Sequence, residues 1–188
     1  MPWLAAALVA LALAACGGDD PVNYSQPVTI NLKAKSSDVD NGALADDKAV
    51  TTETSNPYGA FVSAARDALG GADPSAIELD AATLTLGASS TGVLELGEVF
   101  TGNTEVNFTM NDTNNTYPAA WGAIAATDGS GPLALTTGFT SDGFSTTDFD
   151  KLLNGSFKVG IRGPAAAGFA AANADADLQV TLTFTAFE

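Results

Sequence analysis

The segment between residues 38 and 47 carries the side chains best suited to hold a metal ion. Asp38-Val39-Asp40-Asn41-Gly42 alternates carboxylates and ends in glycine, and Asp46 and Asp47 follow shortly after. Carboxylate oxygens spaced in this way suit a hard cation such as Ca²⁺. The segment departs from an EF-hand, because its glycine comes one position early and no Glu stands at the twelfth place. The pattern therefore leaves two alternatives, a different calcium cage or an acidic, solvated loop with Asx turns.

Tyr117 and Trp121 are the second candidate group. They lie four residues apart, so they would share one face of a regular strand and would also be neighbours on a helix. Two exposed rings on one face could stack against a sugar and form a carbohydrate or small-ligand site. The alternative is a tryptophan in the core with its indole N–H satisfied.

The composition removes most catalytic chemistry. The 188-residue chain has no histidine, and Cys16 is its only cysteine. Ser-His-Asp and Cys-His catalysis, His-ligated zinc and thiolate metal sites are therefore excluded, and no intrachain disulfide can form. Carboxylate-only hydrolysis would need two acids facing one cleft, and no pair in the sequence is placed that way by the strand pattern. We expect a protein that is not an enzyme and requires no cofactor, with calcium as the one candidate ion.

The charge balance limits the partners. The chain has 22 acidic and 7 basic residues, which gives a formal net charge of −15. Nucleic-acid binding requires clustered Lys and Arg, which seven scattered basic residues do not supply. We expect no nucleic-acid partner and an acidic, solvated surface.

The N-terminal segment is typical of export. Residues 4–15 form an uncharged apolar run, which is too short to span a bilayer and has the length of a signal-peptide core. The run ends in Leu13-Ala14-Ala15-Cys16, which resembles the lipobox of bacterial lipoproteins. The resemblance implies cleavage before Cys16 and transfer of diacylglycerol to its thiol, so that the lipid on Cys16 holds the protein to a membrane. One departure is that Met1-Pro2-Trp3 lacks the usual Lys or Arg.

The same resemblance bears on location. Aspartate directly after the lipidated cysteine retains many lipoproteins in the inner membrane, and this chain has Gly17 there. The outer membrane is therefore favoured over the inner one. Residues 1–15 are expected to be the signal peptide, and residues 16–26, which are polar and contain glycine and proline, a lipidated tether.

Residues 27–188 are expected to form one domain built mainly from strands. Period-two alternation predicts strands at 28–35, 77–86, 106–110, 157–161 and 178–185, and apolar runs add 93–100 and 133–135. Ala81-Ala82 interrupts the alternation, as a β-bulge would. Residues 118–126 fit either a strand or a helix, and 36–47 is expected to be a loop.

Two short helices complete the expected elements. Asn56-Pro57 is a cap followed by proline, so a helix should run from 57 to the glycines at 70 and 71. A helical turn is expected over 147–153. The whole pattern fits an antiparallel β-sandwich of about seven or eight strands with one or two short helices.

Together these features predict a lipid-anchored cell-envelope lipoprotein whose β-sandwich is a structural or interaction module. Its partners would be the membrane, through the lipid on Cys16, and an envelope protein or a glycan. The alternatives are a carbohydrate or small-ligand binding module at Tyr117 and Trp121, and a calcium-binding envelope domain.

Overall fold

The computed structural model describes residues 22–188, which form eight antiparallel strands and two α-helices. This confirms the expected fold class. The strands are β1 (Asn23–Lys35), β2 (Ala43–Ala49), β3 (Ala76–Leu86), β4 (Gly102–Met110), β5 (Thr116–Ile124), β6 (Leu133–Thr137), β7 (Phe157–Pro164) and β8 (Asp175–Phe187). The helices are α1 (Pro57–Ala68) and α2 (Thr146–Leu153).

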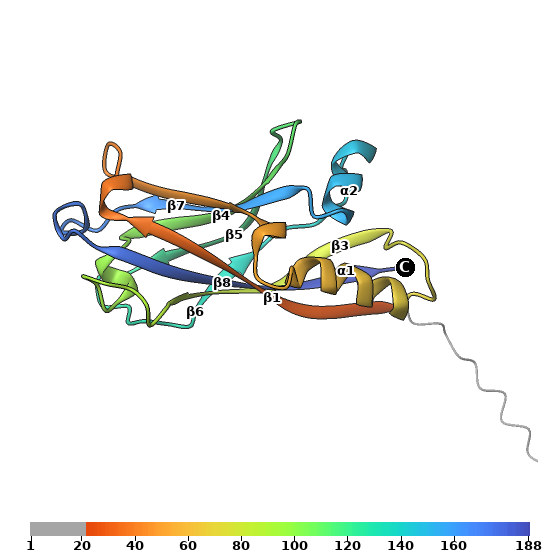
Figure 1. Cartoon of the computed structure of the whole chain (residues 1–188), viewed down its shortest axis with the longest axis horizontal. Helices are drawn as coiled ribbons and strands as arrows, with labels where there is room; N and C mark the ends of the chain where they lie inside the picture. The colour runs from red at the N-terminus through yellow and green to blue at the C-terminus, as the bar shows by residue number, and fades with distance from the viewer. Residues whose placement is uncertain (1–21) are drawn as a thin grey trace, which may run out of the picture.

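The strands form one sheet that folds over on itself. Their order is β1-β8-β3-β6-β5-β4-β7-β2. The short strand β6 pairs with β3 through Leu133 to Leu135 and with β5 through Thr136 and Thr137, so the sheet turns at β6. The result is two facing layers, visible in Figure 1, which we call the β8 layer (β1, β8, β3) and the β4 layer (β5, β4, β7, β2).

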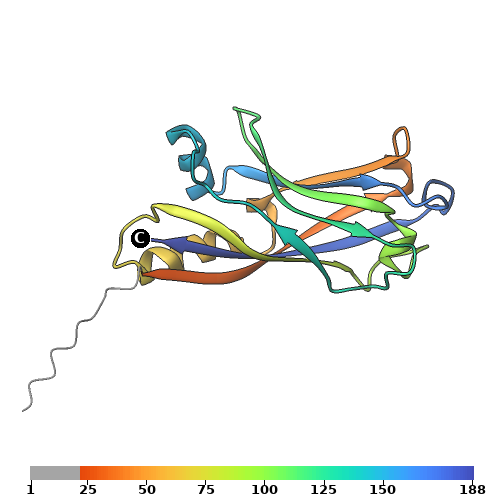
Figure 2. The ribbon, with the colours of Figure 1, turned by 180° about the vertical axis from the view of Figure 1, so that it is seen from behind.

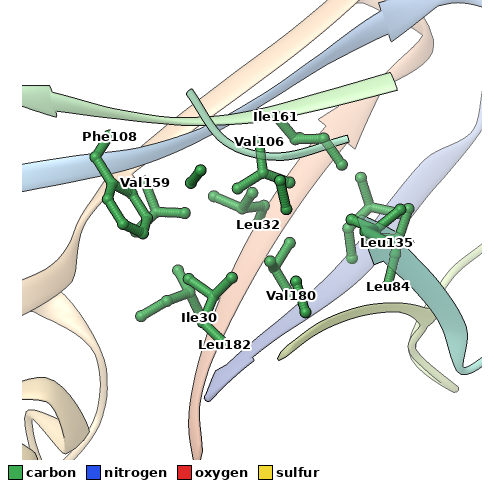
Figure 3. Close-up of a cluster of buried hydrophobic side chains, with 14 of the residues drawn as sticks. Ile30, Leu32, Leu84, Val106, Phe108, Leu135, Val159, Ile161, Val180 and Leu182 are labelled. Atoms are coloured by element: carbon green, nitrogen blue, oxygen red, sulfur yellow. The ribbon is translucent and has the colours of Figure 1, made fainter. Parts of the chain in front are cut away.

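The core lies between these layers and follows the alternation of the strands. Figure 3 shows Ile30, Leu84 and Val180 of the β8 layer facing Val106 and Ile161 of the β4 layer. All five side chains are at most 2 % exposed. Because every second side chain of a strand points to the same face, burial of these residues determines which face of each strand is exposed to solvent.

Helix α1 closes one end of the core, as its sequence predicts. The Asn56 side chain accepts a hydrogen bond from the Gly59 N–H (3.1 Å) and so caps the first turn. Tyr58 and Phe61 then point inward and pack against Phe184 of β8, with ring centroids 5.2 and 5.5 Å away. Both described chain ends lie beside α1 (Figures 1 and 2). Among residues 22–188, no helix is long and apolar enough to cross a membrane.

The expected β-bulge in β3 is also present. The pairing of β3 with β8 shifts between Leu79 and Ala81, where the alternation of apolar residues slips. The extra residue lets Leu79 and Ala82 both reach the buried face. The helical turn expected from residue 147 belongs to α2, which begins at Thr146 and is capped by Ser145.

Two expected boundaries need correction, and one segment that the sequence left open between strand and helix is a strand. Strand β1 begins at Asn23, so the last residues of the tether expected over 16–26 belong to the sheet, where they pair with the end of β8. The loop expected over 36–47 contains most of β2, a strand with only Leu44 buried, whose composition gives no strand signal. The ambiguous segment 118–126 lies mostly in β5.

The prediction of a strand over residues 93–100 is wrong. Residues Leu96–Glu98 form a 3-10 turn instead. The Glu98 carboxylate accepts the backbone N–H groups of Leu94 (2.6 Å) and Glu95 (3.2 Å), which closes the turn locally. A carboxylate that satisfies nearby backbone donors removes them from strand pairing.

The two edges of the folded sheet, β1 and β2, are joined by side chains rather than by a backbone ladder. The N–H of Asn31 in β1 donates to Glu53 Oε1 (2.7 Å), and its carbonyl accepts a bond from Lys48 Nζ (3.2 Å). The N–H of Lys33 donates to Asp46 Oδ2 (2.8 Å). Lys48 and Glu53 also form an ion pair (2.7 Å). We call this set of bonds the β1–β2 seam. The seam supplies hydrogen-bond partners to backbone groups of β1 that would be unpaired at an open edge.

Glu53 is the most buried acid of this seam, only 7 % exposed. Burial alone would raise its pKa, but bonds from Lys48 and Asn31 outweigh burial and hold the pKa below the ordinary value of 4.5. The charged form is therefore the one that the fold stabilises. This contribution is complete above pH 4.5 and is lost as the pH falls through the lowered pKa of the folded state.

We expect Glu53→Gln to lower the free energy of unfolding at pH 7 by about 1–2 kcal/mol, because a neutral amide accepts weaker bonds than a carboxylate. Urea unfolding at a series of pH values measures this. The difference between the two proteins should shrink as the pH falls below 4.5. Glu78→Gln, on the outer side of β3, is the matched control and should change little. A pH-independent difference would contradict this role of the Glu53 charge.

Candidate functional site

The acidic segment forms a tight turn rather than an open loop. Asp40 and Ala43 exchange both backbone hydrogen bonds, each 2.9 Å long, around Asn41-Gly42. Asn41 and Gly42 have φ values of 50° and 77°. Positive φ at both central residues is what a two-residue type I′ turn requires, and Asn-Gly is its preferred sequence. The Asp-Val-Asp-Asn-Gly motif is therefore accounted for by turn geometry.

The four acids proposed as calcium ligands each bond to a different partner. Asp38 accepts the N–H of Lys35 (3.0 Å), Asp40 accepts the side-chain amide of Asn41 (2.9 Å), Asp46 belongs to the β1–β2 seam, and Asp47 pairs with Lys158 (2.7 Å). Burial is the main reason that the pKa of Asp46 is raised. Over residues 22–188, no group of three or more Asp, Glu, His or Cys side chains is arranged to hold a metal ion.

Tyr117 and Trp121 lie on opposite faces of β5, so the expected shared platform is wrong. In the pairing of β4 with β5, Val106 faces Ala120 but Asn107 faces Pro118, and Ala119 is the extra residue of a bulge. Tyr117 then pairs with the buried Phe108 and turns inward, whereas Trp121 pairs with the exposed Glu105 and turns outward. A bulge reverses the face of every residue beyond it.

Tyr117 belongs to a partly buried network around Asp148 of α2. Its ring stacks on Phe144 with centroids 3.9 Å apart, and its hydroxyl donates to Asp148 Oδ2 (2.7 Å). The side chains of Thr113 and Asn115 donate to Asp148 Oδ1 and Oδ2, also at 2.7 Å. Asp148 itself is fully buried. This Asp148 network ties α2 to the tip of the β4–β5 hairpin, which projects beside α2 in Figures 1 and 2.

The electrostatics of the Asp148 network indicate a structural role. Hydrogen bonds from Asn115, Tyr117 and Thr113 lower the pKa of Asp148, despite its burial. The bond to the Asp148 carboxylate is the main reason that the pKa of Tyr117 is raised. A carboxylate held ionised, with bonds to both oxygens, is a poor general acid and has little capacity left for a ligand.

Trp121 stands in a row of outward-facing residues that crosses the β4 layer. The pairing registers align Thr136, Trp121, Glu105, Arg162 and Ala45 on strands β6, β5, β4, β7 and β2. Trp121 is 38 % exposed, and its ring lies over Gly138, where a Cβ would come within 2.7 Å of the indole.

Two shallow hollows, of about 390 and 320 Å³, lie on either side of Arg162 on this outer face. The first is bordered by Asn41, Asn103 and Glu105, and the second by Asp47, Asn107, Thr109 and Thr116. Gly160 lies in the floor of the second hollow, between Asn107 and Asp47 on the neighbouring strands. We call this surface, with the row of Trp121, Glu105 and Arg162, the outer face of the β4 layer.

Sequence reasoning singled out Trp121 but not the residues around it. Asn107 lies within the expected strand 106–110, whereas Glu105 and Arg162 lie one residue outside the expected ranges 106–110 and 157–161. All three face solvent, as ordinary surface residues of a strand also do. The sequence contains one indication of this surface. Gly160 interrupts the outward-facing polar residues of β7, and glycine inside a strand often marks a place where another group approaches. Cys16, the expected lipidation site, lies outside the described residues.

Comparison with known proteins gives no family for this chain. No protein-family model and no curated protein matches it. Among the solved structures, a chain titled "Desmodium yellow mottle tymovirus" is 11 % identical, and the match covers 100 % of this chain and 95 % of that chain. The TM-score of this match is 0.29, which is too low to support an inference about fold or function.

We expect Asp148→Asn to lower the melting temperature by several degrees, because an amide group would present a donor where donors already point at the carboxylate. Hydrogen exchange should increase selectively in α2 and in residues 111–115. Asp150→Asn, two residues along the same helix and exposed, is the control and should leave both measurements unchanged. Native-like exchange in Asp148→Asn would show that the network does not hold the hairpin.

We expect Ca²⁺ and Mg²⁺ at equal concentration to raise the melting temperature equally. Either ion screens a chain of net charge −15, whereas a calcium cage would favour Ca²⁺, since Mg²⁺ demands stricter geometry. Thermal unfolding with each ion measures this. A larger shift with Ca²⁺ that disappears in the double variant Asp38→Asn, Asp40→Asn would establish the calcium site instead.

Proposed function

We propose that this protein is a lipid-anchored lipoprotein of the bacterial envelope, and that its β-sandwich is a non-enzymatic structural or interaction module. The observation that carries the proposal is Leu13-Ala14-Ala15-Cys16 at the end of the apolar run 4–15. Two or three acyl chains at one cysteine would anchor the protein stably, whereas a single chain binds a membrane only marginally. Gly17 favours the outer membrane.

The position of β1 gives this proposal an orientation. β1 begins at Asn23, which pairs with Phe187 at the end of the sandwich beside α1. Residues 17–22 could extend over at most about 20 Å, so a lipid on Cys16 would keep this end near the membrane. The Asn41-Gly42 turn lies at the opposite end of β1, roughly 40 Å away for its 13 residues. The side of the sandwich would then be open to partners in the envelope.

The non-enzymatic part of the proposal follows from the side chains available. The sequence has no histidine, and its single cysteine is the proposed lipid site. Asp148, the most deeply buried acid of the described chain, is committed to the bonds that hold α2. The proposed function requires no cofactor and no nucleic acid, and its partners are the membrane and an envelope protein or glycan.

The anchor is tested in cells with Cys16→Ala. We expect this variant to lose incorporation of labelled palmitate and to leave the membrane fraction, because the thiol that accepts the lipid is gone. Gly18→Ala, two residues further on, is the matched control and should keep both properties. Palmitate labelling of Cys16→Ala, or its retention in the membrane pellet, would refute the proposal.

Sorting is tested separately with Gly17→Asp, which we expect to move the labelled protein from the outer to the inner membrane fraction. Separation of the two membranes on a density gradient measures this. An unchanged distribution would remove the preference for the outer membrane and leave the lipid anchor standing.

A further inference from the structure

We propose that the outer face of the β4 layer binds a neutral oligosaccharide, which lies across the strands over Trp121, Glu105 and Arg162. The proposal deepens the interaction role given above by naming the class of partner. It does not depend on the lipid anchor, since it rests only on residues within the folded domain.

The row of residues matches the chemistry of a sugar chain. Neighbouring strands are about 4.8 Å apart, so the row from Trp121 to Ala45 extends roughly 14 Å, the scale of a few sugar rings. The row presents an indole ring, a carboxylate, a guanidinium and then a small methyl group. Sugars offer apolar C–H faces to an aromatic ring, and hydroxyls that both donate to carboxylates and accept from guanidinium.

Arg162 is available for such a ligand. Of the seven basic residues, Lys48, Arg66, Lys151 and Lys158 form ion pairs. The other three, Lys33, Lys35 and Arg162, form none within residues 22–188, and of these Arg162 lies on the outer face of the β4 layer. Arg162 forms no ion pair and no side-chain hydrogen bond with any residue from 22 to 188, although Glu105 is its neighbour across the strands. Its guanidinium therefore has donors free at the ridge between the two hollows.

The two hollows add hydrogen-bonding side chains on both sides of Arg162. Every outward side chain of β4 from Asn103 to Thr109 can form hydrogen bonds. Gly160 keeps the second hollow open: its φ is not in the left-handed region, and a Cβ would meet only ordinary contacts of 3.6 Å. Neither backbone conformation nor crowding thus requires glycine there, although glycine weakens a strand. A larger side chain at this position would occupy the hollow.

Charge and surface composition argue against other partners. A chain of net charge −15, with Asp47 and Glu105 on this face, repels polyanions such as nucleic acids and acidic polysaccharides. Stable protein interfaces have an apolar centre, whereas Trp121 is the only large apolar side chain exposed on this part of the described surface. A neutral, hydroxyl-rich ligand fits the remaining chemistry.

The test is isothermal titration calorimetry on the full-length chain in a detergent that has no sugar headgroup. The probes are neutral hexasaccharides of glucose, xylose, mannose and N-acetylglucosamine, with polygalacturonate as the anionic comparison. We expect at least one neutral hexasaccharide to bind and polygalacturonate not to bind. Binding of none of the neutral probes at millimolar concentration, or of polygalacturonate alone, would overturn the proposal.

The site is then located with matched variants. Arg162→Ala and Trp121→Ala should each weaken binding at least about tenfold, since each removes a main contact. Gly160→Gln should block the second hollow, whereas Gly160→Ala should have a smaller effect. Lys33→Ala on the β8 layer and Gly129→Gln in a loop are the controls, and should bind like the unmodified chain.

Thermal unfolding of every variant separates loss of the site from loss of the fold. Normal binding by Arg162→Ala, Trp121→Ala and Gly160→Gln with native melting curves would overturn the proposal, because the ligand would then bind elsewhere. Ligand quenching of Trp121 fluorescence in a Trp3→Phe background gives a second readout at the site. Failure here would leave the lipid anchor untouched, since Cys16→Ala tests that independently.

Discussion

The sheet of this protein has two edges that meet without pairing, and the structure depends on how that gap is closed. Strand β1 presents the N–H groups of Asn31 and Lys33 toward β2, where they donate to Glu53 and Asp46. The carbonyl of Asn31 accepts a bond from Lys48. An unpaired edge would otherwise invite another chain to add a strand. The seam also keeps the two layers together at the side opposite β6, where the chain itself makes the turn.

The interior of the described domain is mostly apolar, and Asp148 is its one fully buried acid. The single cysteine excludes an internal disulfide, so burial between the layers carries the stability of the domain. Every second residue of β8, and of β1 from Val28 onward, is buried in that core. In the binding role that we propose, contacts with the ligand are left to the outward residues, which the sheet holds at fixed spacing. This division explains why the candidate binding residues lie on the outer face of the β4 layer.

The strong negative charge has structural as well as surface roles. Glu53 and Asp46 satisfy the edge of β1, Glu98 closes a 3-10 turn, and Asp148 fastens α2 to the β4–β5 hairpin. In each case the acid accepts hydrogen bonds from nearby backbone or side-chain donors and so fixes the local structure. From composition alone, the many acidic residues suggest only solubility or cation binding. In the structure, several of their carboxylates also accept hydrogen bonds from turns, strand edges and a hairpin.

The sequence by itself determined the features that depend on neighbouring residues. Alternation fixed β8 and most of β1, a slip in that alternation located the bulge in β3, and Asn56-Pro57 located α1. Only the tertiary structure determined the features that depend on residues distant in the chain. Strand β2 forms because β7 offers it an edge, and the bulge at Ala119 exists only in the register between β4 and β5. That register separates Tyr117 from Trp121 and aligns Trp121 with Arg162, because side-chain direction in a strand reverses with each residue.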